Sequence, residues 1–453
     1  MSRAGQDASG PAGSIPAWPS ATSKENVATL NSIELLPDNQ KPHSPAPLIT
    51  GISNSGTRAS SAWATGRNCE GVSLRVKKLE SWQEWEALSQ EQILRDAPGC
   101  TIFSTREWLG AWWTAFGQSK QLVAFSISNA SGEVIGLAPL YLEGKRGRKP
   151  NGIRRLRLVG DGTEDSDNLN LIFRSGHEIA CAEALLARLD SEAGWDVCEL
   201  NTLSGDSSVA QTMLFCLKER GWPATIGKRS NSVVPLPNSW EIYLQQLSSE
   251  HAGGIGRYTR RLGRHYAVRI SKCTTEEELP PSLEILFELH QKRWQSRGER
   301  GSFAEPERRQ FYYEMSLGFL RKGWLEFWLL ELDGKPAAAQ FAFRYGTTVY
   351  QLQEGLDPAH YSDRAGMVLR AHILKQLIAQ GVRHYDFLGG ADAHKLSWGA
   401  RPGTYTDISF AKPFSRGSGY LFLRHRTRIA RDWLRSRMPN RVLKAYRQIR
   451  THA

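Results

Sequence analysis

The stretch that decides the fold runs from Trp324 to Gly399 and reads WLEFWLLELDGKPAAAQFAFRYGTTVYQLQEGLDPAHYSDRAGMVLRAHILKQLIAQGVRHYDFLGGADAHKLSWG. Its first two apolar runs, residues 325–331 and 339–343, are separated by Asp333-Gly334. Asp-Gly between apolar runs is a strong signal for a tight hairpin turn. A third apolar run follows at residues 349–353. The pattern predicts three consecutive strands, the first two joined as a hairpin.

A helix and one more strand complete the stretch. Apolar residues at near-helical spacing predict a helix over residues 367–378, with Gln380-Gly381 as its stop. Tyr385-Asp386-Phe387-Leu388-Gly389-Gly390 then reads as a short strand that ends in glycines. The turn Ser362-Asp363-Arg364-Ala365-Gly366 leads from a strand into the helix. A helix N-terminus offers unpaired N–H groups that suit a phosphate, so Arg364, Ala365 and Gly366 are the candidate cofactor-binding residues.

Short motifs accompany these elements in a characteristic order. They are Leu289-His290-Gln-Lys-Arg293-Trp294, Arg297-Gly298, Asp333-Gly334-Lys-Pro-Ala-Ala338, Gly355-Leu-Asp-Pro358, Arg364-Ala-Gly366, Asp386-Phe-Leu-Gly-Gly390 and Lys395-Leu-Ser-Trp398-Gly399. Together they resemble the GNAT-like acetyltransferases of the CelD/BcsL type, a bacterial family associated with cellulose and exopolysaccharide biosynthesis and related to the FemAB aminoacyl transferases. The resemblance spans residues 240–412. His394-Lys395 stands where the family commonly has Tyr-Lys.

The resemblance implies a mixed α/β fold with tandem GNAT-like acyltransferase domains. The first half agrees, because predicted strands and helices follow each other there in the same hairpin-first order. It shows no obvious counterpart of Asp386-Phe-Leu-Gly-Gly390, which favours a supporting or substrate-shaping role. We expect an N-terminal GNAT-like domain over residues 69–237 and a C-terminal GNAT-like acyltransferase domain over residues 238–412.

Composition sets the ends of the chain apart. Residues 1–68 are rich in Ser, Ala, Gly, Pro and Asn, and they are expected to form a disordered low-complexity segment. They contain no apolar core of signal-peptide length, and no window of the chain offers about 18 uninterrupted apolar residues. The expected location is therefore the cytoplasm, with a peripheral position at the inner membrane as an option.

The net charge of +12 is concentrated in the last residues. From Pro413 onward eleven basic residues face one acidic residue, Asp432, which places +10 of the charge there. Apolar residues at near-helical spacing predict a basic amphipathic helical tail over residues 413–453, interrupted near Pro439. Such a face suits an anionic membrane surface, and a solvated helix packed on the core is the alternative. Nucleic acid is not favoured, because no recognised binding motif accompanies the charge.

Six cysteines are scattered without metal-ligand or redox spacing, so neither a disulfide framework nor a zinc site is expected. Nucleophile-elbow and metalloprotease motifs are absent from the sequence. No metal is implied.

Acyl transfer needs a base for the acceptor, and the sequence offers three candidate catalytic residues. Asp386 ends an apolar strand beside glycines, and a plain turn-capping role is the alternative for it. Glu354 is the second candidate base, and Lys395 could neutralise a phosphate or carboxylate. The candidate substrate-binding residues are His290, Arg293, Trp294, Gly390 and Trp398, with packing as the alternative for Trp398 and a structural role as the alternative for the first three.

The resemblance implies an acetyltransferase that uses acetyl-CoA or another acyl-CoA and acts on a carbohydrate or cell-envelope precursor. We expect direct in-line attack on the thioester, because no convincing Cys or Ser nucleophile is present. A FemAB-like transferase that uses aminoacyl-tRNA is the first alternative. Its phosphate contacts would come from the tail and from the arginines of residues 253–264. A non-catalytic assembly factor for a polysaccharide synthase is the second.

Overall fold

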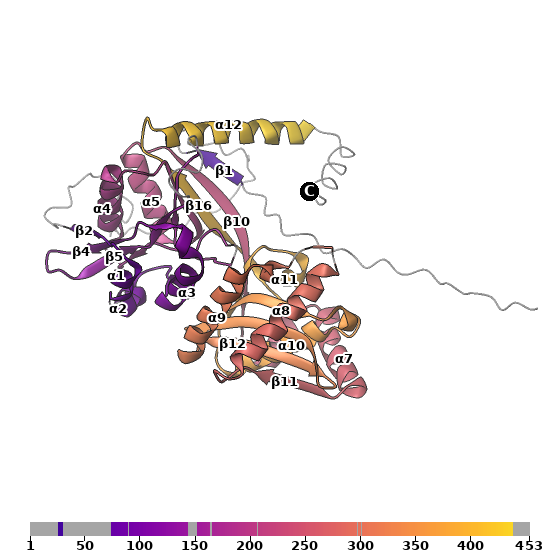
Figure 1. Cartoon of the computed structure of the whole chain (residues 1–453). Coiled ribbons are helices and arrows are strands. Elements are labelled where there is room, and N and C mark those ends of the chain that lie inside the picture. The colour runs from indigo at the N-terminus through magenta and orange to yellow at the C-terminus, as the bar shows by residue number, and fades with distance from the viewer. Residues whose placement is uncertain are drawn as a thin grey trace, which may run out of the picture.

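The computed structural model shows a chain of two lobes that share one long sheet (Figure 1). It describes residues 26–29, 74–88, 90–143, 152–163, 165–205, 207–296, 298–299 and 301–437, without the side chains of 26–29, 431–432 and 434–437. The predictions for most of residues 1–68, and for the tail beyond residue 437, lie outside the described residues. Among the described residues, no helix combines the length and the apolar character that a membrane crossing requires.

The first lobe contains the following elements, in chain order: β1 (Asn26–Thr29), β2 (Arg75–Lys78), α1 (Trp82–Glu86), α2 (Gln90–Asp96), η1 (Ile102–Ser104), α3 (Arg106–Phe116), η2 (Gly117–Ser119), β3 (Gln121–Leu122), β4 (Phe125–Ser128), β5 (Val134–Ala138), β6 (Leu140–Glu143), β7 (Arg155–Leu158), β8 (Ile172–Phe173), α4 (Glu178–Ser191), β9 (Val197–Ser204), α5 (Ser208–Glu219) and β10 (Ala224–Pro235).

The second lobe and the end of the chain contain α6 (Trp240–Gln246), α7 (Ser249–His265), β11 (Val268–Lys272), α8 (Leu279–Gln295), η3 (Ser302–Ala304), α9 (Pro306–Arg321), β12 (Leu325–Leu332), β13 (Lys335–Tyr345), β14 (Thr348–Leu356), η4 (Pro358–His360), α10 (Ala365–Ala379), β15 (His384–Gly389), α11 (Ala393–Ser397), β16 (Arg401–Phe410) and α12 (Arg416–Arg437).

The strands, hairpin and helix predicted between Trp324 and Gly399 are confirmed. Asp333 and Gly334 turn the hairpin with positive φ values of 51° and 76°, the backbone that an Asp-Gly turn provides. Residues 253–264, whose arginines are candidates for phosphate contacts, form part of helix α7. The tail is helical from Arg416 to Arg437.

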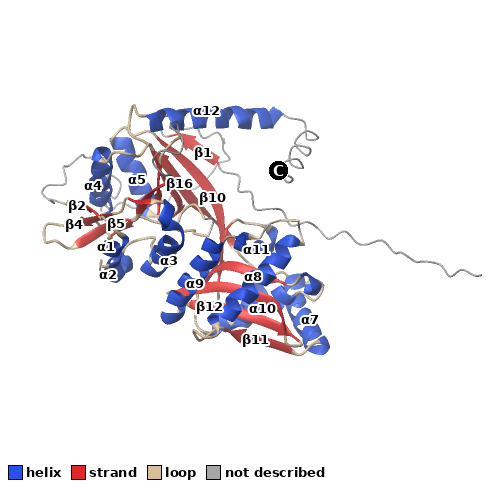
Figure 2. Ribbon diagram, viewed as in Figure 1, coloured by secondary structure: helices blue, strands red, loops and turns tan. Residues whose placement is uncertain are grey.

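One sheet joins the two lobes (Figure 2). Its strand order is β11-β12-β13-β14-β15-β10-β16-β9-β7-β6-β3, and a smaller sheet has the order β2-β4-β5-β8. Strand β10 pairs with β15 of the second lobe and, along most of its length, with β16. Strand β16 follows the second lobe in sequence but lies between β10 and β9 in the first. The expected boundary at residues 237 and 238 thus falls just after β10, while the hydrogen-bonded sheet runs across it.

Strand alternation divides the core of the second lobe into two layers. Phe327 and Leu329 of β12 point to the layer of α8 and α9, which is continuous with the core of the first lobe. Trp328 and Leu330 point to the opposite layer, which α6, α7 and α10 cover. Successive side chains of a strand face opposite sides, so one apolar run serves both layers.

Aromatic rings fasten the first lobe to the second. Phe103 lies edge-on to Phe343 and to Tyr350, with ring centroids 5.8 and 5.6 Å apart, and Trp108 lies 5.5 Å from Phe343. All these rings are buried. Buried aromatic pairs of this kind stabilise a fold beyond the burial of their area. The two lobes therefore share one hydrophobic core.

Replacement of Gly355 by Ala is expected to destabilise the protein by about 1–3 kcal/mol, because overpacking strains a close-packed core. A Cβ at Gly355 would lie 2.6 Å from Cβ of Leu289, where α8 crosses β14. The matched control is Gly253→Ala on exposed α7, where a Cβ would meet nothing within 4 Å. Helix propensity predicts a gain of up to about 1 kcal/mol there. Urea unfolding measures both, and equal free energies of unfolding would contradict the close approach.

Candidate active site

The site begins where two parallel strands separate. β14 and β15 pair from Thr348 and His384 only as far as Tyr350 and Asp386. Within the described residues β14 continues to Leu356 without further pairing to β15. A strand directs its backbone groups alternately to its two sides, so N–H and C=O groups of β14 beyond Tyr350 face the gap. These groups can bind an extended ligand laid between the strands.

The N-terminus of α10 lies just beyond the end of β14. Its capping residue Arg364 has a left-handed conformation with φ 57°, and its side chain makes no capping hydrogen bond. In the described part of the chain, the N–H groups of Ala365 and Gly366 donate to no acceptor. A Cβ at Gly366 would meet only the Leu356 side chain, at 3.6 Å. Ala365 is fully buried and Gly366 is partly exposed, so the open space at the turn that the sequence singles out for phosphate lies beside Gly366.

Asp363 fixes the shape of this turn. Its carboxylate accepts a hydrogen bond from the Tyr266 hydroxyl at 3.1 Å, lies 3.1 Å from Nδ1 of His360 and pairs with Arg261 at 3.6 Å. The hydrogen bond with His360 is the main reason that the pKa of Asp363 lies below its usual range. Side chains from η4, α7 and the residue after α7 therefore hold Asp363, which lies just before the N-terminus of α10.

Asp386 is a buried carboxyl group at the point where β14 and β15 part. Its side chain is 5% exposed, and Oδ1 accepts a hydrogen bond from the Leu388 N–H at 2.7 Å. Leu388 has a positive φ of 59°, because β15 bulges there and two of its residues face one residue of β10. Burial raises the pKa of Asp386 to about 7. Asp386 can therefore change protonation state near neutral pH.

A carboxylate of the first lobe and a lysine complete this cluster. Asp167 accepts a hydrogen bond from the Gly389 N–H at 2.8 Å, and burial raises its pKa. Lys395 donates to the carbonyl oxygens of Phe387, at 3.0 Å, and of Gly389. Burial lowers the pKa of Lys395. The cluster of Asp386, Asp167 and Lys395 thus draws on both lobes.

Glu354, the second candidate base, lies between two arginines. Arg293 of α8 approaches it at 3.7 Å, and Arg370 of α10 forms an ion pair with it. Arg370 is buried and lies over the rings of Phe387 and Trp398, 5.1 and 5.3 Å from their centroids. A carboxylate that holds two guanidinium groups is engaged in positioning them.

His394 extends this network as an uncharged partner. Its Nε2 lies 3.0 Å from Arg370. Burial, with the neighbouring charge of Arg370, lowers the pKa of His394 to about 2. The neutral ring can therefore accept a hydrogen bond from the guanidinium.

The other predicted substrate-binding residues surround the same region. His290 is buried, its Nε2 accepts a hydrogen bond from the Trp294 indole at 2.8 Å, and burial lowers its pKa to about 4. Trp398 is 1% exposed, and its carbonyl accepts a hydrogen bond from the Tyr243 hydroxyl at 2.8 Å. Gly390 donates to Ser230 and accepts from Ser232, both on β10. His290 and Trp398 are therefore core residues, and Trp398 lies against Arg370.

Sequence reasoning missed two participants, Asp167 and Arg370. Asp167 belongs to the polar stretch Thr163-Glu-Asp-Ser-Asp167, whose cluster of acidic residues was its only signal. Arg370 interrupts the apolar face of a helix, which is unusual for a buried position and could have marked it.

The first lobe repeats the backbone arrangement of the second. β7 and β9 are also parallel and pair over three residues, and Glu199 occupies the third position, as Asp386 does in β15. Thr202 of β9 has a positive φ of 58°, close to that of Leu388. A geometric counterpart of the predicted catalytic strand therefore exists, although its sequence is different.

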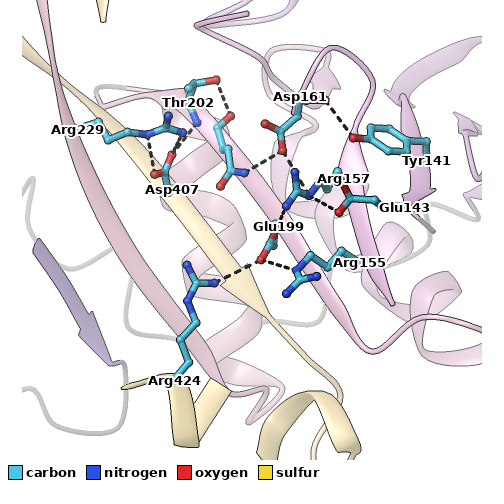
Figure 3. Close-up of polar contacts among 11 residues, drawn as sticks. Tyr141, Glu143, Arg155, Arg157, Asp161, Glu199, Thr202, Arg229, Asp407 and Arg424 are labelled. Atoms are coloured by element: carbon cyan, nitrogen blue, oxygen red, sulfur yellow. Dashed lines mark hydrogen bonds and ion pairs between the residues drawn. The ribbon is translucent and has the colours of Figure 1, made fainter. Parts of the chain in front are cut away.

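In the first lobe, ion pairs surround the end of the β7–β9 pairing (Figure 3). Glu199 pairs with Arg157 at 2.9 Å, with Arg155 at 3.5 Å and with Arg424 of α12 at 3.3 Å. Beside it, Arg229 holds Asp407 through two hydrogen bonds of 2.8 Å. Glu199 forms ion pairs with three guanidinium groups, whereas within the described chain Asp386 forms no ion pair with an arginine. This contrast favours the second lobe as the place of chemistry.

The stability of the protein is expected to fall as pH rises from 4 through 7, in part because of Asp386. Its pKa is about 7 in the folded chain and about 4 when unfolded, so only the folded state keeps the proton in this window. The contribution of Asp386 to the free energy of unfolding can fall by about 4 kcal/mol over this range. Asp386→Asn removes this contribution, so its free energy of unfolding relative to wild type improves as pH rises. Exposed Glu250→Gln is the control, and a constant difference between Asp386→Asn and wild type at pH 4 and pH 8 would refute the raised pKa.

Comparison with known proteins identifies the second lobe. Residues 249–396 match the model of the acetyltransferase (GNAT) domain, and no curated protein matches the sequence. This stretch contains the donor turn, Glu354, Asp386 and Lys395. The domain match does not single out the CelD/BcsL type.

Solved structures place the fold of both lobes. The crystal structure of FemX shares 13% identity with this chain, with a TM-score of 0.51, and the alignment covers 73% of this chain and 96% of FemX. A conserved protein of unknown function from Bacteroides thetaiotaomicron VPI-5482 aligns with 11% identity and a TM-score of 0.48, over 75% of this chain and 100% of that one. The chain has a mixed α/β fold shared with FemX, residues 249–396 form an acetyltransferase (GNAT) domain, and the protein is an acyltransferase.

Proposed function

We propose that the protein transfers an acyl group from acyl-CoA, with acetyl-CoA as the first candidate, to an amine or hydroxyl of a carbohydrate or cell-envelope precursor. The observation that carries this proposal is the buried carboxyl of Asp386, with a pKa of about 7, at the mouth of the gap between β14 and β15. The available N–H groups of α10 lie at the end of the same strand. The association with cellulose or exopolysaccharide biosynthesis rests on the sequence resemblance.

The donor is proposed to enter along β14. Its phosphates would meet the N–H groups of Ala365 and Gly366 and the positive end of α10. The pantetheine arm, which is amide-rich and extended, would pair with the backbone groups of β14 that face the gap. Exposed Arg257 and Arg260 on α7, which packs on α10, add positive charge on the same side.

The chemical step is proposed to be direct attack on the thioester. Asp386 takes the proton of the acceptor as the acceptor nitrogen or oxygen bonds to the acyl carbon, and the carbon–sulfur bond breaks to release CoA as a thiolate. Backbone N–H groups of β14 would stabilise the oxyanion. A carboxyl with a pKa near the working pH is suited to this role.

Three buried cysteines of the described chain favour direct attack over a covalent intermediate on their thiols. Burial raises the pKa of Cys181 to about 12 and that of Cys216 to about 11. Burial also raises the pKa of Cys198 well above the usual thiol value. The nucleophilic form of cysteine is the thiolate, which these thiols do not supply at neutral pH.

Asp386 is preferred to Glu354 as the base because of what surrounds each. Glu354 is engaged by Arg293 and Arg370 and is assigned to positioning them. Lys395, whose ammonium group holds the carbonyl of Phe387, keeps the bulge beside Asp386 in shape. The acceptor is proposed to bind between the lobes, where Asp167 approaches Gly389 next to Gly390. Trp294, which donates a hydrogen bond to His290, is proposed as a further contact.

A second candidate is an aminoacyl-tRNA-dependent transfer at the same site. It is favoured by the exposed arginines of α7, Arg257, Arg260, Arg261 and Arg264, which could bind nucleic-acid phosphates beside the donor turn. Loss of activity on RNase treatment would select it over the CoA donor.

Replacement of Gly366 by Trp is expected to abolish binding of acetyl-CoA, because the indole would fill the space at the first turn of α10. Gly366→Ala is the matched control and should bind as wild type does, since its Cβ meets only Leu356 at 3.6 Å. Calorimetric titration with acetyl-CoA measures both. Absence of binding in wild type would move the donor assignment to aminoacyl-tRNA or to the non-catalytic assembly role.

Asp386→Asn is expected to lower kcat by about 10²–10⁴-fold while leaving the Kd for acetyl-CoA unchanged, since the amide cannot accept the proton. Release of the CoA thiol with glucosamine as acceptor is the first assay. A larger loss for Glu354→Gln would reverse the assignment of the base. In cells, unchanged function after the joint substitution Asp386→Ala and Lys395→Ala would favour an assembly role over catalysis.

A further inference from the structure

Helix α12 lies across the first lobe, with one side held against the sheet (Figure 1). Leu421 is buried, and Arg424 forms its ion pair with Glu199 of β9 (Figure 3). The Tyr420 hydroxyl accepts a hydrogen bond of 3.1 Å from Arg155 of β7. Gly417 lies so close to the Asp196 carbonyl that a Cβ would clash with it. These contacts fix which side of α12 faces the sheet.

The opposite side of α12 exposes large apolar side chains. Phe422, Leu423 and Ile429 are 62%, 61% and 56% exposed. At 100° per residue, Phe422 and Ile429 lie within 20° of each other, and Leu423 lies 100° from Phe422 and 160° from buried Leu421. A helix that leaves a continuous apolar strip in water gains by covering it. We name the set Phe422, Leu423, Arg426 and Ile429 the outer strip.

The positive charge of α12 indicates which kind of partner would bind the outer strip. Between Arg416 and Arg437 the sequence has seven arginines against Asp432 alone, a net charge of +6. The guanidinium of Arg426 lies 5.4 Å from the ring of Phe422, so charge and apolar surface occur together on the exposed side. Anionic lipid offers negative phosphates above an apolar layer, which complements this combination. Nucleic acid offers phosphates and bases that stack on aromatic rings, but no apolar layer for Leu423 and Ile429.

We propose that the outer strip of α12 docks the protein on the surface of an anionic phospholipid bilayer. The helix lies parallel to the surface, with Phe422, Leu423 and Ile429 at the boundary between headgroups and acyl chains and Arg426 among the phosphates. The sheet side of α12 stays attached to the first lobe through Arg424 and Tyr420. This docking is independent of the proposed acyl transfer.

The test is sedimentation of the full chain with vesicles. Vesicles of phosphatidylcholine with about one third phosphatidylglycerol are expected to bind the protein, and pure phosphatidylcholine vesicles are not, with binding weakened by salt. Phe422→Ser with Ile429→Ser should weaken partitioning at least tenfold, and Arg426→Ser should weaken it less. Phe215→Ser is the matched control, because Phe215 of α5 is 46% exposed but lies outside the strip.

Three results would overturn the proposal. They are equal binding to both kinds of vesicle, no binding to the anionic ones, and a double variant that binds as wild type does. Sedimentation velocity without lipid detects the competing explanation, a contact between copies of the chain. If the double variant then changes a dimer into a monomer and wild type does not bind vesicles, the strip is a protein interface. Circular dichroism and thermal unfolding confirm that each variant is folded, since all the substituted side chains are exposed.

Discussion

The hydrogen-bond ladder of β10 is the constraint on which the arrangement of the two lobes depends. Along one edge β10 pairs with β16 from Ala224 to Val233, and at its far end it pairs with β15. Because β16 comes after the second lobe in sequence, the two lobes cannot separate without breaking strand pairs. The ladder therefore holds Asp167 of one lobe within hydrogen-bond distance of Gly389 in the other. A hinge between the lobes at this point would cost several buried backbone hydrogen bonds.

The two lobes share one backbone arrangement, but the acidic residue in it has different surroundings in each lobe. In each lobe a parallel pair of strands stops after three residues, and an acidic residue stands at the last paired position. Glu199 is surrounded by arginines that form ion pairs with it. Asp386 is buried beside backbone amides and a lysine that bonds to carbonyl oxygens. Desolvation therefore dominates at Asp386, and a duplicated backbone yields one set of structural ion pairs and one titratable group.

Local patterns were sufficient to predict the strands and the helix between Trp324 and Gly390. The apolar runs, the Asp333-Gly334 turn and the helical spacing of residues 367–378 all depend on near neighbours, and each element formed as expected. The association of Asp167 with Gly389 depends on the path of a sheet that joins residues more than 200 positions apart, which no local pattern contains. The placement of Glu354 between arginines of α8 and α10 likewise depends on how these helices pack on the sheet, which no local pattern contains. The counterpart strand in the first lobe escaped notice because its backbone geometry is kept while its sequence is not.

Gly417 gives α12 a fixed rotational setting. With no side chain there, the first turn of the helix seats against the Asp196 carbonyl at the start of β9, and rotation about the helix axis would bring Ser418 or Arg416 into that contact. The exposed side of the helix thus points in one direction relative to the sheet, and through the sheet relative to the gap beside Asp386. A partner bound to α12 consequently fixes the orientation of the whole molecule. The gap between β14 and β15 then opens in one fixed direction relative to that partner.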